Sequence, residues 1–108
     1  MRKKYRVKKN EEFQAIMGRR KFYRSSSFIV YIKEKSLEIS RIGISVPKKL
    51  GNAVVRNKTK RQIRSMLDDI GFGNYDYDCI IIVRKVYFTR EYEENRKDLE
   101  KLLKHVKI

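Results

Sequence analysis

The stretch from Asn52 to Ile70 constrains the fold of this chain more than any other. Apolar or small side chains recur along it at helical spacing, at Val55, Thr59, Ile63, Met66, Leu67 and Ile70. At about 100° per residue these positions fall on one stripe, which predicts an amphipathic helix with one buried face. Asn52 is a favourable N-cap residue, and Gly71 suits a left-handed C-terminal stop.

The opposite face of this predicted helix is cationic. Its polar side chains are Arg56, Asn57, Lys58, Lys60, Arg61 and Arg64. No acid occurs between Glu38 and Asp68, so the helix itself offers these cations no counter-charge. Like charges spaced i, i+4 destabilise a helix by about 0.2–0.5 kcal/mol per pair. A merely solvated basic face usually interleaves Glu with Lys, so this pattern favours binding to a polyanion.

Positive charge is concentrated in the N-terminal part of the 108-residue chain. The net charge is +15; residues 1–67 contain 20 Lys or Arg against 4 acids, whereas residues 68–108 contain 8 against 9. Residues 1–9 form a basic arm, either a flexible solubilising tail or an extension that contacts phosphates. A hydrophobic fraction of 41% suffices for one packed core, so we expect a single domain over residues 1–108 with its positive side facing a partner.

Cys79 is the only cysteine, which excludes a disulfide within the chain and a cysteine-based metal site. No apolar run approaches the ~18 residues of a membrane span, and none of signal-peptide length follows the basic N-terminus. We therefore expect a cytoplasmic protein without membrane association. We also expect no obligate protein partner.

Hydrophobic patterns around the central helix predict the other elements. They are a helix over 10–18, an extended stretch at 22–23, strands over 28–32 and 39–46, a loop over 71–74, a strand over 79–83 and a helix starting near Thr89. Asn10 is the expected cap of the first helix, and a hairpin at 33–38 is expected to join the two long strands. The apolar run 79–83 is typical of a central strand. The strands flanking the central helix should be parallel, and general chirality rules predict a right-handed crossover.

Two aromatic residues, Phe13 and Tyr31, have alternative interpretations. Both could be ordinary core residues. Alternatively, they line a cleft beside the small residues Gly43 and Ser45, where they would offer stacking surfaces for single-stranded bases. Residue spacing leaves both interpretations open.

Residues with catalytic chemistry are scarce. His105 is the sole histidine and has no Ser or Cys near it in sequence, and Cys79 is expected to be a small buried hydrophobe. Close acid pairs occur at Asp68–Asp69 and at Asp76 and Asp78, and two carboxylates alone make a poor metal cage. We therefore expect neither a catalytic residue nor a metal ligand in the protein.

Residues 48–64, with the sequence KKLGNAVVRNKTKRQIR, resemble the RNR motif of the bacterial ribonuclease P protein subunit family. The resemblance continues in order through residues 9–13, 28–31, 41–46 and 80–85. Three positions depart from the family pattern: Lys58 stands where Arg is usual, Ser65 where an acid is common, and Met17 where an aromatic is frequent. Lys58 keeps the charge but loses the bidentate geometry of Arg.

The resemblance implies an α+β two-layer sandwich similar to a ribosomal-protein domain, with a mixed four-stranded sheet and the order α-β-β-β-α-β-α. It implies a left-handed parallel crossover, which we follow over the general rule. It also implies that Mg²⁺-dependent catalysis belongs to an RNA subunit, and that the protein assists removal of the 5′ leader of precursor tRNA. The residues implied to contact the catalytic RNA are Lys48, Lys49, Arg56, Asn57, Lys58, Lys60, Arg61 and Arg64. Those implied to line the leader cleft are Phe13, Met17, Ile29, Tyr31 and Ser45.

Two other classes of protein fit the same pattern of charge. One is a ribosomal or other structural RNA-binding protein of the same fold, which would copurify with ribosomal RNA. The other is a DNA-binding helix module, which would prefer DNA over RNA in competition because the 2′-hydroxyl distinguishes the two.

Overall fold

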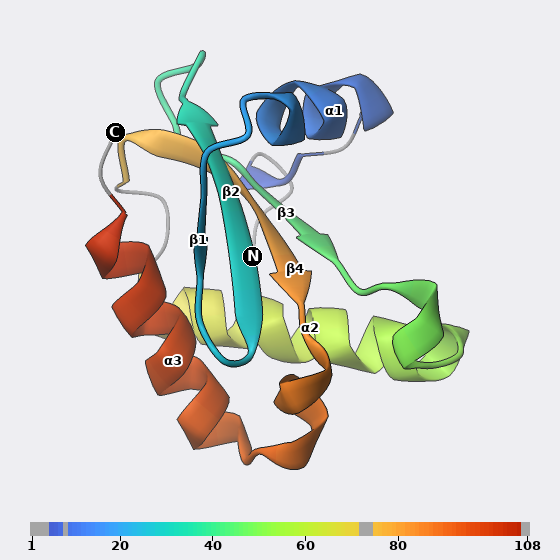
Figure 1. The fold of residues 1–108 in the computed structure, drawn as a ribbon. Helices are drawn as coiled ribbons and strands as arrows, with labels where there is room; N and C mark the ends of the chain where they lie inside the picture. The colour runs from blue at the N-terminus through green and yellow to red at the C-terminus, as the bar shows by residue number, and fades with distance from the viewer. Residues whose placement is uncertain (1–4, 8, 72–74, 107–108) are drawn as a thin grey trace.

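A four-stranded mixed sheet organises the molecule (Figure 1). The computed structural model describes residues 5–7, 9–71 and 75–106. The strands are β1 (Phe22–Arg24), β2 (Phe28–Glu34), β3 (Ile42–Ser45) and β4 (Tyr77–Val83), in the spatial order β1-β2-β4-β3. β2 pairs antiparallel with β1 and β4, and β3 pairs parallel with β4. The predicted mixed sheet of four strands is confirmed.

β4 occupies an inner position of the sheet, and this placement overturns one expectation. The predicted hairpin at 33–38 between β2 and β3 is wrong, because β4 lies between these two strands. The physical reason is burial: every residue of β4 except Ile82 is buried, including Ile80 and Ile81 on opposite faces. A strand that is apolar on both faces buries most surface when it has a neighbour on each side.

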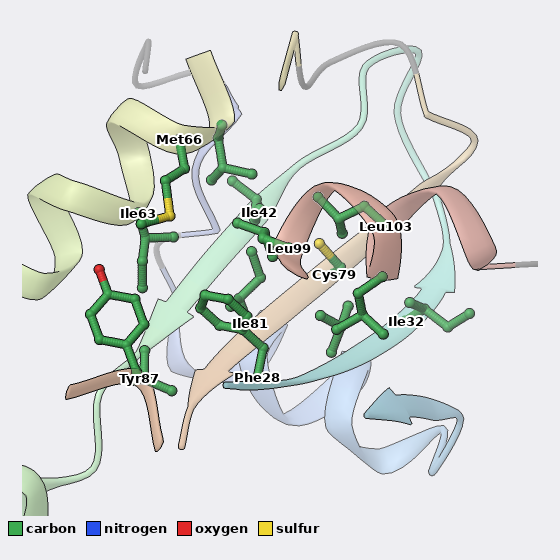
Figure 2. Close-up of a cluster of buried hydrophobic side chains, with 14 of the residues drawn as sticks. Phe28, Ile32, Ile42, Ile63, Met66, Cys79, Ile81, Tyr87, Leu99 and Leu103 are labelled. Atoms are coloured by element: carbon green, nitrogen blue, oxygen red, sulfur yellow. The ribbon is translucent and has the colours of Figure 1, made fainter. Parts of the chain in front are cut away.

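Three helices cover the two faces of the sheet unequally (Figure 1). They are α1 (Asn10–Gly18), α2 (Ala53–Ile70) and α3 (Tyr92–His105). The main core lies where α2 and α3 pack on one face; Figure 2 shows Ile63 of α2, Leu99 of α3 and Phe28 of β2 in it. On the other face α1 covers only part of the sheet, with Ile16 packed against Ile80.

α2 begins and ends where its sequence predicts. The Asn52 side chain accepts a hydrogen bond from the backbone N–H of Val55 at 3.0 Å, and Gly71 ends the helix in the left-handed conformation with φ of 81°. The predicted buried positions Thr59, Ile63, Met66 and Leu67 are buried. Ile70 is half-buried.

Val55 is the exception on that stripe, because its side chain is 37% exposed. In Figure 1 the start of α2 projects beyond the strands, so its first turn has no sheet beneath it. Val55 packs locally instead: a Cβ added to Gly51 would lie 2.7 Å from Val55 Cγ1.

The crossover from β3 through α2 to β4 is left-handed. In Figure 1 β3 and β4 point downward, α2 crosses behind the sheet, and β4 lies to the left of β3. The handedness implied by the family resemblance is therefore confirmed, and the right-handed expectation was wrong. The turn η2 (Lys48–Leu50) carries the chain past the end of β3, and α2 then runs across the strands rather than along them.

Several element boundaries differ from the predicted ones. Lys9, not Asn10, is the N-cap of α1, and the Glu12 carboxylate accepts from the Lys9 backbone N–H at 3.4 Å. α3 begins after Glu91 rather than near Thr89, because Thr89 belongs to a short turn, η3 (Lys85–Thr89), and its hydroxyl donates to the Val86 carbonyl.

β3 starts at Ile42 rather than near residue 39. Ser40 still anchors the preceding segment, since its hydroxyl donates to the carbonyl of Tyr77. Arg6 bridges to the same strand, and the Val7 N–H donates to the Ile42 carbonyl at 2.8 Å. Residues 1–4 and 8 of the predicted arm and residues 72–74 of the predicted loop lie outside the described residues.

Candidate nucleic-acid interface

The cations of α2 divide into two rows that face different surroundings. Arg56, Lys60 and Arg64 are half-buried along one edge of the helix. Asn57, Lys58 and Arg61 are exposed beside them. We call Lys58 and Arg61, together with Asn57, the outer row of α2. Lys48 and Lys49 of η2, just before the helix, are also exposed.

None of these cations is neutralised by the part of the chain that the structure describes. The ion pairs between described residues involve other basic side chains, such as Arg19, Arg90 and Arg96. In addition, the Nε atoms of Arg56 and Arg64 are buried without a hydrogen-bond partner among the described residues. Guanidinium groups that lack a carboxylate partner among the described residues are suited to an external anion.

Phe13 of α1 packs directly on the sheet at Gly43 of β3. A Cβ added to Gly43 would lie 2.7 Å from Phe13 Cζ and 2.7 Å from Ile80 Cδ1. A side chain at position 43 would therefore displace the Phe13 ring. This close approach explains why position 43, one of the two small residues predicted beside the cleft, is a glycine.

A cleft of about 160 Å³ opens beside the Phe13 ring, and we call it the upper cleft. Its lining includes Arg6, Phe13, Gly43, Lys60 and Arg64. Burial, together with the nearby Arg6 guanidinium, lowers the pKa of Arg64 from its ordinary value. A bound anion would counteract both effects, because it favours the charged form of arginine.

A second and larger cleft, of about 500 Å³, is lined in part by side chains on the face of the sheet that α1 covers, and we call it the lower cleft. Ile29 and Ile82 are apolar lining residues from paired strand positions. Lys49, Arg84 and Lys85 line it as well. An apolar surface bordered by cations is suited to bases and phosphates of a flexible strand.

Two aromatic side chains, Phe22 of β1 and Tyr31 of β2, lie side by side on the sheet, and we call them the aromatic row. The pairing register places Phe22, Tyr31, Ile80 and Gly43 opposite one another across the four strands. The Phe22 and Tyr31 rings are 5.3 Å apart, and the Arg24 guanidinium carbon lies 6.0 Å from the centre of the Phe22 ring. Phe22 is 45% exposed, which leaves it available for stacking.

The five residues predicted for the leader cleft lie on one side of the sheet, but in more than one place. Phe13 lines the upper cleft and Ile29 the lower one. Tyr31 and Met17 pack around the small cluster beneath α1. Ser45 lies opposite Ile82 in the register, next to the lower cleft. Phe13 and Tyr31 are both half-buried and pack against the small buried cluster beneath α1, so each combines a core contact with some exposed surface.

Sequence reasoning missed several residues of the two clefts and of the aromatic row beside them. They are Arg6, Phe22, Arg24, Ile82, Arg84 and Lys85. The alternation of Phe22 and Arg24 could have indicated a strand face. It could not have indicated which strand lies opposite, since the register with Tyr31 and Ile29 is a tertiary contact.

The residues considered for catalysis lie in separate parts of the structure. Cys79 is fully buried, and this burial raises the pKa of its thiol. His105 is exposed at the end of α3. Asp69 accepts from the Tyr92 hydroxyl at 3.4 Å. Within the described ranges no group of three His, Cys, Asp or Glu side chains is placed to hold a metal ion. No helix in these ranges is long and apolar enough to cross a membrane.

Fold and surface together define a class: a small basic α+β protein with a left-handed parallel crossover, whose central helix carries cations without a carboxylate partner in the part of the chain that the structure describes. Sequence comparison supports a specific family within that class. The family model for Ribonuclease P matches residues 1–107. The ribonuclease P protein component of Mesoplasma florum is 44% identical over 105 residues, which cover 95% of this chain and 96% of that protein. The corresponding component of Mycoplasma mycoides is 45% identical over 109 residues, with coverage of 99% and 100%.

Solved structures agree with the sequence relatives. The Staphylococcus aureus RNase P protein superposes with a TM-score of 0.83 at 38% identity, over 93% of each chain. The Thermotoga maritima RNase P protein superposes with a TM-score of 0.82 at 27% identity, over 95% of this chain and 98% of that chain. The chain belongs to the ribonuclease P protein family.

Proposed function

We propose that this protein is the subunit of a ribonuclease P ribonucleoprotein that binds its catalytic RNA and the 5′ leader of precursor tRNA. The observation that carries the proposal is the cationic surface of α2, which no described carboxylate neutralises, together with a partly aromatic sheet face lined by clefts. Family membership supports the general role in tRNA 5′ processing.

In this proposal the outer row of α2 contacts the folded catalytic RNA. Lys58 and Arg61 are exposed and have no carboxylate partner among the described residues, so RNA phosphates can approach them directly. Lys48, Lys49 and Arg56 extend the same surface. Phosphate contacts of this kind supply most of the non-specific affinity for a nucleic acid and make binding salt-dependent.

The leader is proposed to lie along the sheet face between the lower and upper clefts. Stacking of an unpaired base on an aromatic ring contributes about 1–3 kcal/mol, and Tyr31, Phe22 and Phe13 offer such rings. Lys60 and Arg64 line the upper cleft together with Phe13, which supports the proposal that they hold leader phosphates. The family resemblance implies that these two residues contact the catalytic RNA. We propose instead that they lie where the RNA-binding surface meets the leader.

We assign no bond-breaking step to a protein side chain. Mg²⁺, when bound, would supply the activated water and neutralise phosphate charge, and we propose that the RNA subunit and the substrate hold it mainly. The protein's own contribution is to bind and orient the substrate. Such positioning raises cleavage most when Mg²⁺ is scarce, because the cations of the protein then replace part of the missing charge.

Reconstitution tests the proposal directly. Purified protein is added to a bacterial ribonuclease P RNA, and cleavage of a precursor tRNA is measured over a range of Mg²⁺ concentrations. We expect stimulation over the RNA alone at low Mg²⁺, diminishing as Mg²⁺ rises. Absence of stimulation at every concentration would contradict the proposal.

Two substitutions separate the proposed surfaces. Arg61→Ala should weaken assembly with the catalytic RNA, because it removes a phosphate contact. Tyr31→Ala should leave assembly intact and weaken binding of precursors that carry a leader, because it removes a stacking surface. Equal effects of both variants on assembly would rule out two separate surfaces.

A further inference from the structure

Arg41 connects α1 to the sheet. Its guanidinium Nη1 makes an ion pair with Glu12 of α1, and its Nη2 lies 4.0 Å from Asp78 Oδ2 on β4. The backbone N–H of Arg41 also donates to Asp78 Oδ1 at 2.8 Å. One residue thus joins a helix and a strand that are far apart in the chain.

The connection is largely sheltered from solvent. The side chains of Arg41, Glu12 and Asp78 are 17%, 25% and 3% exposed. A second ion pair, between Arg19 just after α1 and Glu34 of β2, is 2.8 Å long but 51% and 56% exposed. Removing one partner of a buried ion pair is costly, whereas exposed pairs contribute little. The Arg41 pair is therefore the one expected to determine where α1 lies.

Both partners of the Arg41–Glu12 ion pair lie close in sequence to residues that contact each other at the Phe13 ring. Glu12 directly precedes Phe13, and its carboxylate also accepts from the Lys9 N–H at the start of α1. Gly43, against which the Phe13 ring packs, follows Arg41 by two residues on the same segment. Two neighbouring contacts therefore join α1 to the β3 segment. One is the ion pair of Glu12 with Arg41, and the other is the packing of the Phe13 ring on Gly43.

We propose that Arg41 is a positioning residue for leader binding: by holding Glu12 beside Asp78, it fixes α1 over the sheet and keeps the Phe13 ring at the upper cleft. The inference rests on the proposed function, since it assumes that a single-stranded leader uses this cleft. Arg41 acts through Phe13, because its guanidinium is turned to the two carboxylates.

The test compares Arg41→Gln with Arg19→Gln, a matched control that removes the exposed ion pair at the other end of α1. Each full-length variant is assembled with the catalytic RNA. Binding is then measured for one precursor tRNA with a long leader and for the same precursor with a one-nucleotide leader. For Arg41→Gln we expect about tenfold weaker binding of the long-leader substrate, and less than about twofold change for the short-leader substrate and for the catalytic RNA. Arg19→Gln should change none of the three by more than about twofold.

Two further measurements distinguish positioning from general destabilisation. In a Phe13→Ala background, Arg41→Gln should cause no additional loss of long-leader binding, because coupled residues are not additive. Arg41→Lys keeps the charge and should restore part of the binding. Equal weakening of both substrates by Arg41→Gln, or full additivity with Phe13→Ala, would overturn the inference.

Hydrogen exchange of the α1 amides in the free protein separates this inference from the proposed function. We expect faster exchange in α1 for Arg41→Gln than for Arg19→Gln, since the former releases the helix from the sheet. Unchanged exchange in Arg41→Gln would overturn the positioning role even if leader binding by the wild type is observed. If wild-type binding does not depend on the leader, the proposed function fails instead.

Discussion

α2 and α3 pack on the same face of the sheet, yet their charges are arranged in opposite ways. Each helix buries four residues against the sheet, including Ile63 in α2 and Leu99 in α3. α3 has Glu93 and Glu94 in its first turn and basic residues in its last turn. This arrangement complements the helix dipole.

Arg96 and Lys104 of α3 are also paired with acids of the same helix. Arg96 donates to Glu93 at 2.7 Å and lies 4.0 Å from Glu100, and Lys104 lies 3.6 Å from Glu100. α2 has the reverse distribution, with no acid in its first turn, no base in its last turn, and Asp68 and Asp69 near its C-terminus.

The contrast shows that burial and capping, rather than surface charge, hold α2 in place. Its charges oppose the helix dipole and repel one another, so they lower the stability of the free protein. The same charges would gain energy from an RNA partner. α3 uses its charges for the protein's own stability, whereas the charges of α2 are suited to binding.

The largest expected effect tests whether burial supports both helices equally. Ile63→Ala and Leu99→Ala should each lower the free energy of unfolding by about 2–5 kcal/mol, because each removes a fully buried side chain. Urea unfolding followed by circular dichroism measures both. A much smaller loss for Ile63→Ala would indicate that α2 is not held by its packing in the free protein.

The next effect concerns RNA affinity and its dependence on salt. Replacing both Lys58 and Arg61 by Ala should weaken catalytic-RNA binding about 100-fold, since each charge-assisted contact contributes about 1.5 kcal/mol or more. The slope of log affinity against log salt should also become less negative by about 2. The matched α3 variant, with Lys97 and Lys101 replaced by Ala, should change affinity less than about twofold. A similar loss in both variants would mean that net charge alone drives binding.

Removing an N-cap residue should lower the free energy of unfolding by less than removing a core residue, and by different amounts in the two helices. Asn52→Ala should cost about 1 kcal/mol of stability, because it removes the side-chain bond to the Val55 N–H. At the start of α3 the Glu94 carboxylate accepts from the Glu91 backbone N–H at 3.2 Å, and Glu91→Ala leaves this bond in place, so it should cost less. Thermal unfolding of the two variants side by side measures the difference, and equal losses would contradict the role given to Asn52.

The smallest effect comes from giving α2 the charge pattern of α3. Val54 is 75% exposed at the position that corresponds to Glu93 in α3. Val54→Glu should raise the free energy of unfolding by about 0.5 kcal/mol, because an acid in the first turn complements the dipole and lies i, i+4 from Lys58. The variant should also bind RNA more weakly than the wild type. A Val54→Gln control separates charge from helix propensity.

Local patterns in the sequence determined much of this protein. The length, caps and cationic face of α2 follow from contacts between residues at most four positions apart, and the two faces of β2 follow from a period of two. Such features depend little on the rest of the fold. The exceptions are at the ends of elements, as with Val55, where the sheet no longer lies beneath the helix.

Only the tertiary structure decided which surfaces meet. Burial on both faces draws β4 between β2 and β3, which removes the expected hairpin and brings Ile82 beside Ile29. The packing of α1 against β3 and α2 places Phe13 with Lys60 and Arg64 at the upper cleft. These contacts join residues tens of positions apart, and they depend on which arrangement of the whole chain buries the most apolar surface. No local pattern contains that information.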